Sequence, residues 1–508
     1  MTDVLTTDEK RILHLRADLE DAGYAVETLA GLLGPAAGAA LHRDHLLPAR
    51  RALSGRDEPA AVLVRLFVLG EAVPAVLIDA ALPRTGADGL RELGLVAGVD
   101  RRPGTAPTRG GLLAAVLDLR PYGDERHTWW VLSDLSELVT GGPLPTHHVL
   151  GVGGASTTLA SWTPRPEVDR ALDLGTGCGV QALHLSVHAR EVVATDVSTR
   201  ALQMARFTAV LNQVPLDLRH GSMLEPVEGE VFDLVVSNPP FVITPRRDGV
   251  PRYEYRDGGR AGDHLVADLV GRVGRHLRPG GTAQLLANWE LAPGEDWTRH
   301  VTGWLDGTGL DAWVVQREVQ DVEGYAETWV RDGGHRPGTA EFGALHAAWL
   351  DDFAERGVER VGFGVVTLQR PQTDRDPWRD LVDVRHPVAS PMGPHVLAGL
   401  RARTWLAEHD DDDLLDVAWQ VADDVTEERI GRPGAPDPQV IQLRQGGGLR
   451  RTVRLDTVGA GFVGACDGDL TARQLCAGLA VLTEVEPAAV VAEVLPLLRD
   501  LVGDGLLR

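Results

Sequence analysis

The strongest constraint on the fold is a regular alternation of short apolar segments and longer amphipathic segments that starts near residue 170. The apolar segments ALDLG, EVVATD, VFDLVVS and TAQLLANWE alternate with helical patterns at 180–189, 199–212 and 265–277. Strands that alternate with helices of this kind predict an α/β domain with a doubly wound, mostly parallel sheet. Two further strands, at 311–319 and 361–370, and a helix at 341–356 complete the expected sheet.

The chain is too long for a single core, since 508 residues correspond to about three domains. We predict an N-terminal helical, winged-helix-like domain at 1–105, connecting strands at 106–150, the α/β domain at 151–371 and a C-terminal α+β, winged-helix-like domain at 372–508. The helix that follows Asp88 could recognise nucleic acid. Winged helices also serve as packing or protein-docking modules, and both interpretations stay open.

Composition excludes several classes of protein. The first residues lack a signal pattern and no segment reaches about 18 uncharged apolar residues, so we expect a cytoplasmic protein with no membrane partner. Cys178, Cys466 and Cys476 are far apart and lack metal-ligand spacing, so we expect free thiols and no metal. The net charge of −23 disfavours a nucleic acid partner without excluding one.

A glycine-rich turn follows the first strand of the α/β domain, in the segment ALDLGTGCGVQ at 171–181. Gly175, Gly177 and Gly179 permit a tight turn and let a cofactor lie directly against the backbone. Asp173 and Thr176, in the same segment, are further candidate cofactor-binding residues. Turns of this kind also bind NAD or FAD, so the motif alone does not identify the cofactor.

The next strand ends at Asp196, 21 residues after Gly175, and Val197 follows it. A carboxylate at the carboxyl edge of this strand can accept both ribose hydroxyls of an adenosyl cofactor. The alternative is that Asp196 caps the helix that starts at Thr199, although Ser198 could do so instead.

The segment VVSNPPFV at 235–242 follows the fourth strand. The side-chain oxygen of Asn238 and the backbone carbonyl of Pro239 can accept the two N–H bonds of a planar amine or carboxamide, and Pro239 and Pro240 hold that carbonyl rigidly. Phe241 can stack on the flat substrate. The alternative is a rigid turn with Phe241 in the core.

Asn-Pro-Pro-Phe at this place, after a glycine turn and an acidic strand end, resembles the signature of the Asn/Asp-Pro-Pro-Tyr/Phe amino-methyltransferases. The chain resembles the HemK/PrmC type within that group, the "methyltransferase small" domain, over about residues 150–370. The resemblance implies the Rossmann-like class I methyltransferase fold with a seven-stranded, mostly parallel sheet. It also implies S-adenosyl-L-methionine as the cofactor and Asn238 as the residue that orients the acceptor nitrogen.

Two cofactor contacts depart from the family pattern. Many relatives have an Asp after the third strand for the adenine amine, but this chain has Ser222 and Met223 there, so Ser222 or the backbone must substitute. Met223 is a further candidate cofactor-binding residue. The segment from Gly153 to Thr157 is the candidate for closing over the methionine end of the cofactor.

On the acceptor side, residues 320–338 are predicted to form a mobile lid with Tyr325 and Trp329 as stacking groups, although ordinary packing of Trp329 is an alternative. Arg256 is a candidate substrate contact. Together with Arg246, Arg247 and Arg252 it could line a channel for phosphates, or the four side chains could belong to a solvated loop.

Three hypotheses for function follow. The favoured one is methylation of a glutamine side chain in a protein partner. The second is methylation of a purine amine in RNA or DNA, and a small-molecule amine also remains possible. The third is a noncatalytic adaptor that binds cofactor, which the intact Asn238 and glycines argue against.

Overall fold

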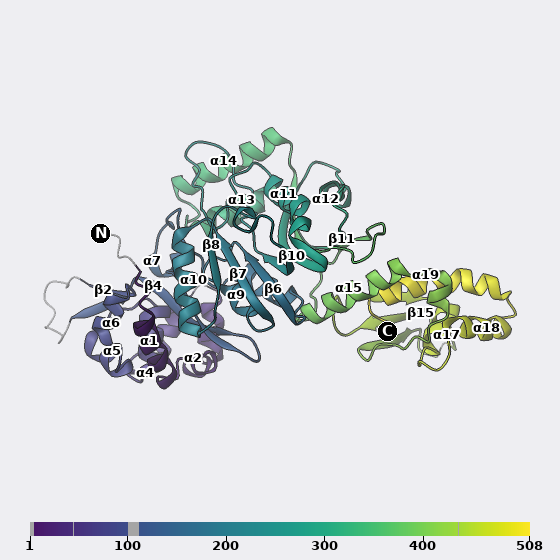
Figure 1. Ribbon diagram of the computed structural model, residues 1–508, viewed down its shortest axis with the longest axis horizontal. Helices are drawn as coiled ribbons and strands as arrows, with labels where there is room; N and C mark the ends of the chain where they lie inside the picture. The colour runs from purple at the N-terminus through teal and green to yellow at the C-terminus, as the bar shows by residue number, and fades with distance from the viewer. Residues whose placement is uncertain (1–4, 44, 100–110, 435) are drawn as a thin grey trace.

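The computed structural model describes residues 5–43, 45–99, 111–434 and 436–508 (Figure 1). The purple N-terminal part lies below the central teal sheet in this view, and the green-to-yellow C-terminal part extends to the right.

The central domain is a single sheet with strand order β13-β11-β12-β10-β9-β6-β7-β8 among the described residues. All of its strand pairs are parallel except those of β12, which is antiparallel to both neighbours. The predicted α/β class and the mostly parallel sheet are thus confirmed. The strands are β6 (Val168–Leu174), β7 (Ala189–Asp196), β8 (Asp217–His220), β9 (Phe232–Ser237), β10 (Leu277–Leu291), β11 (Asp311–Asp321), β12 (Arg360–Gln369) and β13 (Arg379–Asp383).

The sheet has one strand more than the seven predicted, at least in the described part of the chain. The added strand, β13, pairs in parallel with β11, so the sheet continues past the predicted domain end at 371. Asp311 fixes this connection: its buried carboxylate accepts two 2.7 Å hydrogen bonds from Arg375 and a third from the Trp378 backbone N–H. A five-residue edge strand with the sequence RDLVD lacks the apolar run from which the other strands were predicted.

Helices cover both faces of the sheet. On one face α11 (His264–Val273) and α12 (Trp297–Leu305) pack over β10 and β11 in one apolar cluster. On the other face lie α8 (Gly154–Trp162), α9 (Val180–Leu185) and α15 (Gly393–Glu408). The predicted helix at 341–356 is α14 (Ala340–Arg356).

The N-terminal module begins with α1 (Glu9–Asp21), α2 (Val26–Leu41) and α3 (Leu46–Ala52). It continues with α4 (Pro59–Leu63), η1 (Val64–Val68), β1 (Val73–Pro74), α5 (Ala75–Ala81), α6 (Gly86–Glu92), β2 (Val96–Gly98) and β3 (Leu112–Ala115). This helix–strand–helix–helix–strand–strand order is the one that a winged helix requires, and we propose that assignment. The predicted boundary at 105/106 lies outside the described residues, and β3 pairs with β1 and β2 rather than connecting domains.

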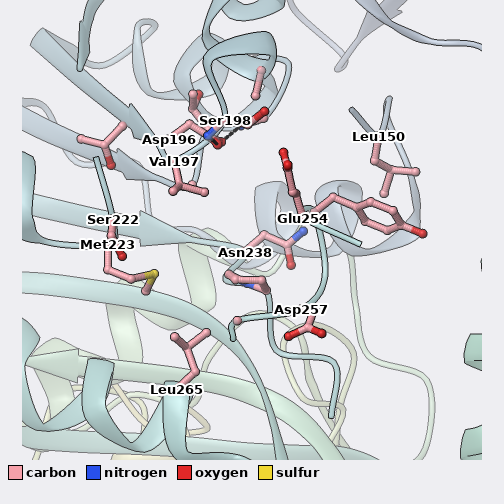
Figure 2. Close-up of a pocket in the computed structure, with 18 of the residues that line it drawn as sticks. Leu150, Asp196, Val197, Ser198, Ser222, Met223, Asn238, Glu254, Asp257 and Leu265 are labelled. Carbon is pink, nitrogen blue, oxygen red and sulfur yellow. Dashed lines mark hydrogen bonds between the residues drawn. The ribbon is translucent and has the colours of Figure 1, made fainter. Parts of the chain in front are cut away.

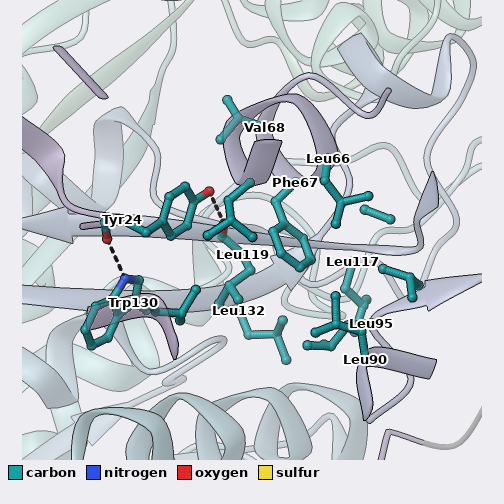
Figure 3. Packing of buried hydrophobic residues seen from close by; sticks show 14 of the residues in the cluster. Tyr24, Leu66, Phe67, Val68, Leu90, Leu95, Leu117, Leu119, Trp130 and Leu132 are labelled. Atoms are coloured by element: carbon teal, nitrogen blue, oxygen red, sulfur yellow. Dashed lines mark hydrogen bonds between the residues drawn. The ribbon is translucent and has the colours of Figure 1, made fainter. Parts of the chain in front are cut away.

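The N-terminal module and the central domain share one hydrophobic core. The hairpin of β4 (Leu117–Gly123) and β5 (Thr128–Asp134) lies between them. Figure 3 shows the part of this core that lies between the N-terminal helices and the strands β4 and β5. Tyr24 donates its hydroxyl hydrogen to the Leu119 carbonyl at 2.8 Å, and the Trp130 indole donates to the Tyr24 carbonyl at 2.7 Å. The same apolar cluster continues into the central domain through buried Phe207 of α10 (Thr199–Asn212).

Polar side chains of α10 complete the free edge of β5. Asn212 accepts a hydrogen bond from the Trp130 N–H at 2.9 Å and donates one to the Trp130 carbonyl at 2.7 Å. Thr208 accepts from the Leu132 N–H at 3.2 Å. The helix thus takes the place of a neighbouring strand.

The C-terminal domain is attached through α15. Its remaining elements are α16 (Asp411–Leu415), β14 (Val425–Ile430), β15 (Val440–Gln445), β16 (Thr452–Leu455), α17 (Thr457–Gly464), α18 (Ala472–Thr483) and α19 (Pro487–Gly503). Its elements include both helices and strands, as an α+β domain requires: α18 begins with a capping box between Thr471 and Gln474, and β14 to β16 form an antiparallel sheet. Close to the end of the chain, Leu507 pairs with Val421.

No single helix among the described residues is long and apolar enough to cross a membrane. The pair α1 and α2, bent by 51°, passes that test only when the two are taken together.

We predict that Asn212→Ala lowers the free energy of unfolding by about 1–3 kcal/mol, because it leaves the Trp130 N–H and carbonyl without partners in a largely buried place. Urea denaturation of the full-length protein measures this. Arg206→Ala is the matched control: it removes an exposed ion pair to Glu9 from the same helix and should change stability little. Equal effects of the two substitutions would contradict the edge-completing role of Asn212.

Candidate active site

A cavity of about 410 Å³ opens at the carboxyl ends of β6, β7, β8 and β9. This is the edge where ligands bind in parallel α/β sheets. Figure 2 shows Asp196 and Val197 on one side of it, Ser222 and Met223 on another, and Asn238 at its centre. The predicted residues that line it are Gly175, Thr176, Gly177, Asp196, Val197, Ser222, Met223, Asn238 and Pro240.

The glycine turn presents backbone to the cavity. Gly175 and Gly177 have φ angles of 77° and 56°, which L side chains rarely adopt. A Cβ placed on either would meet no atom within 4 Å, so the space beside both is open. Gly179 differs: it does not line the cavity, and a Cβ there would lie 3.6 Å from Ala205 of α10, which indicates close helix packing.

Asp173 lies beneath this turn rather than in the cavity. Its buried carboxylate accepts hydrogen bonds from the Thr176 hydroxyl at 2.6 Å and from the Ala182 N–H at 2.9 Å. Burial raises the pKa of Asp173 to about 7. The residue therefore fixes the turn and supplies a charge that depends on pH near neutrality.

Asp196 is held by backbone groups on both sides. One carboxylate oxygen accepts from the Gly177 N–H at 2.9 Å and the other from the Ser198 N–H at 2.8 Å. Ser198 occupies the N-cap position of α10, but its side chain makes no capping hydrogen bond. Because Asp196 accepts the Ser198 N–H, it satisfies one backbone donor at the start of this helix, which is part of the capping role given as its alternative. Each oxygen keeps lone pairs for a ligand. Burial raises the pKa of Asp196, and the charge of Glu254 adds to the shift.

Asn238 follows the end of β9, which is fixed by a 2.7 Å hydrogen bond from the Ser237 hydroxyl to the Leu174 carbonyl. Its side-chain oxygen is buried and has no hydrogen-bond partner among the described residues. The Pro239 carbonyl accepts the Phe241 N–H at 2.7 Å, so only one of its lone pairs is left for a substrate.

Phe241 does not line the cavity, contrary to its predicted stacking role. Its ring lies 6.4 Å from that of Trp329 at an angle of 74°, among three apolar clusters that meet behind the Asn-Pro-Pro-Phe turn. The Phe241 side chain is therefore packed inside a rigid turn, which was the alternative interpretation. Asn238 and Pro240 line the cavity.

The prediction of a mobile lid at residues 320–338 is also wrong. Residues 322–332 form the helix α13 (Val322–Asp332), and Tyr325 is fully buried in it. The Tyr325 hydroxyl accepts from the Ile243 N–H and the Asn288 side chain, both at 3.0 Å. Hydrophobic packing of Tyr325, Trp329 and Trp349 in one cluster explains why this segment is a core helix and not a loop.

Arg256, the predicted substrate contact, is buried and committed elsewhere. It donates to the Asp332 carboxylate at 2.5 Å and to the Trp329 carbonyl at 2.8 Å, and its guanidinium lies 4.4 Å from the Tyr253 ring centroid. The residue thus connects the loop after the Asn-Pro-Pro-Phe turn to α13 and does not reach the cavity.

The predicted closing segment, Gly153 to Thr157, reaches the cavity through Ser156, whereas Gly153 and Thr157 do not line it. The Thr157 hydroxyl is used within the helix α8, where it donates to the Gly153 and Gly154 carbonyls. Residues 148–151, which precede the segment, also line the cavity.

Sequence reasoning missed four further lining residues that Figure 2 labels: Leu150, Glu254, Asp257 and Leu265. Leu265 occupies an apolar position of the predicted helix at 265–277, which gave no sign of its facing a cavity. Glu254 and Asp257 belong to the segment YEYRDGG, and the only available signal was that it lies within residues 150–370, the part of the chain that resembles the family.

The family description "Methyltransferase small domain" matches residues 151–296. Two descriptions that read "Domain of unknown function" match residues 21–106 (DUF7059) and 398–508 (DUF7782). The known family therefore coincides with the part of the chain that builds the cavity.

The chain is similar to the release factor glutamine methyltransferase of Deinococcus radiodurans, with 34% identity over 210 residues, covering 35% of this chain and 75% of the relative. It is also similar to the ribosomal RNA small subunit methyltransferase C of Citrobacter koseri, at 29% identity, covering 35% of this chain but only 48% of that protein. A release factor glutamine methyltransferase of Koribacter versatilis is 32% identical, and the match covers 27% of this chain and 54% of that protein.

Solved structures include a methyltransferase of Pyrococcus furiosus, with a TM-score of 0.27 and 18% identity, covering 46% of this chain and 92% of that one. A 16S rRNA methyltransferase of T. thermophilus, in complex with AdoMet and guanosine, has a TM-score of 0.28 and 18% identity, covering 45% and 59%.

We predict that Asp196→Ala weakens binding of S-adenosylmethionine by about 1.5–3 kcal/mol, the value of hydrogen bonds to a charged group, or roughly 10- to 150-fold. Isothermal titration calorimetry measures the dissociation constant. Asp217→Ala, which removes an exposed carboxylate from the neighbouring strand, is the control and should leave binding unchanged. Unchanged affinity in Asp196→Ala would refute the assignment.

Cofactor affinity should also rise with pH between about 5.5 and 7.5. Asp173, whose pKa is raised to about 7, is largely neutral at the lower limit and largely ionised at the upper one, and its negative charge favours a cofactor with a net positive charge. The expected gain is severalfold. Asp173→Asn should remove most of this rise, whereas an undiminished rise in that variant would assign the pH dependence to another group.

Proposed function

The chain belongs to the HemK-like group of class I S-adenosylmethionine-dependent methyltransferases, and we propose that its acceptor is a glutamine side-chain amide in a partner protein. The observation that carries the proposal is the buried, unpaired oxygen of Asn238 in the cavity. A buried acceptor without a partner costs free energy, and a planar N–H group is the chemical complement that would satisfy it.

The residues of the cavity fit the cofactor. The open space beside Gly175 and Gly177 would be filled by any side chain there, and Asp196 offers free lone pairs at the edge of β7. Apolar Met223 and Leu265 stand on the same side as Ser222, where a flat base can be enclosed. When bound, the cofactor supplies an electrophilic methyl group on its sulfonium.

Asn238 orients the acceptor nitrogen. Its side-chain oxygen accepts one amide N–H, and the remaining lone pair of the Pro239 carbonyl is available for the other. With both N–H groups held in this way, the nitrogen lone pair would be free to accept the methyl group that a bound cofactor supplies, and one amide proton would leave to solvent. Acceptors that strengthen as the nitrogen becomes positive stabilise the transition state more than the bound substrate.

Charges around the cavity favour a protein acceptor over a nucleic acid. Arg246 is paired with Asp257 at 2.6 Å, Arg247 with Glu355 at 2.5 Å and Arg256 with Asp332 at 2.5 Å. These are three of the four arginines that were candidates for phosphate contacts, and a phosphate would have to displace their carboxylates. The fourth, Arg252, is exposed and has no hydrogen bond or ion pair with a described residue. Glu254 and Asp257, which line the cavity, would repel it further.

A purine amine in ribosomal RNA is the second candidate, because the relatives include ribosomal RNA small subunit methyltransferases. The winged-helix order of the N-terminal module is compatible with delivery of RNA. Its acceptor would use the same Asn238 oxygen.

Tritium transfer from labelled cofactor into cell lysate, separated into protein, RNA and small molecules, tests the acceptor class. We expect label in protein and a loss of about 100- to 1000-fold in the single-turnover rate for Asn238→Ala, the magnitude for removal of an oriented group that acts at the transition state. Asn238→Asp should keep partial activity, since it offers the same acceptor oxygen.

Calorimetric cofactor binding by the same preparations is the control, and it should stay nearly unchanged in Asn238→Ala. If the label enters only RNA, the acceptor is the second candidate, a purine amine, and not a glutamine side chain. A wild-type rate in Asn238→Ala would refute the amide-orienting mechanism for either acceptor.

A further inference from the structure

Helix α18 is apolar on two faces, and only one of them is buried. Its sequence, ARQLCAGLAVLT, has polar side chains only near its two ends. Leu475 and Ala480 belong to the C-terminal core, whereas Val481 and Leu482 are 79% and 80% exposed. These are the highest exposed fractions of any large apolar side chain that the structure describes. A helix that is apolar all round is normally buried all round, so one face of α18 lacks the cover that its sequence leads us to expect.

The exposed apolar surface continues across the turn into α19. Val485 in the turn is 43% exposed, and Ala488 and Ala489 in the first turn of α19 are exposed as well. Residues 481–489 are all exposed, and we call them the α18–α19 tip. Figure 1 shows α18 and α19 in the C-terminal part that extends away from the central sheet, and none of these residues lines the cofactor cavity. Single exposed apolar side chains are normal, but a contiguous group of them marks an interaction site.

Two negative charges border this apolar surface. Glu484 and Glu486 are the only charged residues of the tip, and both are exposed. Neither side chain has a hydrogen bond or an ion pair with a residue that the structure describes. The arginines of the two helices, Arg473 and Arg499, are not free to neutralise them, because both are paired with aspartates of α16. The tip is therefore an apolar surface with a negative border.

These charges distinguish among the surfaces that could cover the tip. A second copy in a symmetric contact would bring the glutamates of both chains together, and each chain carries a net charge of −23. An anionic membrane surface would be repelled for the same reason. The matching surface carries apolar side chains next to positively charged ones.

We infer that the α18–α19 tip docks a partner protein through a basic amphipathic helix of that partner. The apolar face of the helix covers Val481 and Leu482, and its Lys or Arg side chains pair with Glu484 and Glu486. The tip consists of two helix ends and a turn, so it offers no strand edge to which a partner could add a strand. The contact is independent of the acceptor that the cavity methylates, because the tip lies outside the cavity.

The test uses the full-length protein and a sixteen-residue peptide of Leu and Lys, patterned as an amphipathic helix and labelled for fluorescence anisotropy. Wild-type protein should bind this peptide. The double substitution Val481→Ser, Leu482→Ser should weaken binding about tenfold or more, since burial of even one such side chain is worth that factor. Glu484→Gln with Glu486→Gln should weaken it about twofold to tenfold, the range of two exposed ion pairs. Ile430→Ser, which changes a 52% exposed apolar side chain of β14 in the same domain, is the matched control and should keep the wild-type affinity.

All the substituted side chains are exposed, so the variants should keep the wild-type stability, which urea denaturation checks. A peptide with Glu in place of every Lys should not bind. Equal binding of the Leu and Lys peptide by wild-type protein and by the Val481→Ser, Leu482→Ser variant would overturn the inference, and so would equal binding of the Leu and Glu peptide. Self-association of wild-type protein in sedimentation velocity, or binding to phosphatidylglycerol vesicles, that this double substitution abolishes would also overturn it, because a second copy or a membrane would then cover the tip.

Discussion

The geometry of the site depends on the buried carboxylate of Asp173. Its hydrogen bonds to Thr176 and Ala182 join the end of β6, the glycine turn and the start of α9 into one unit. The Gly177 N–H of this turn donates to Asp196 and so fixes the end of β7. The Leu174 carbonyl at the end of β6 accepts the Ser237 hydroxyl at the end of β9. Three strand ends are thus held in register, and Asn238 comes immediately after the third.

The central sheet could be predicted from sequence because its strands are apolar runs between helices, a signal that is local and repeated. Asp196 and Asn238 could be predicted for the same reason, since each follows directly from a strand end. The environment of Phe241 and Tyr325 could not, because it depends on a cluster formed by residues that are more than a hundred positions apart. The edge strand β13 was missed because a polar five-residue segment acquires its conformation from pairing with β11 and from the Asp311–Arg375 ion pair.

The segment that follows the β4–β5 hairpin contributes to the site as well. The segment after β5 is fixed by two hydrogen bonds between Asp134 and Val149, and residues 148–151 then line the cavity. Thr146 in the same segment holds the backbone of Glu254. The cofactor and acceptor ends of the cavity are therefore both connected to a part of the chain that the known methyltransferase family does not cover.

The core shared by the N-terminal module and α10 also determines the order in which the chain can fold on the ribosome. Helices α1 to α6 and the β4–β5 hairpin leave apolar surface uncovered until Phe207 and Leu211 have been synthesised. Chains elongate at about 5–20 residues per second, so this surface stays exposed for several seconds while β6 and β7 emerge. A chaperone that binds exposed apolar surface would meet the nascent chain in this interval, before the lining residues from Gly221 to Arg272 have been synthesised.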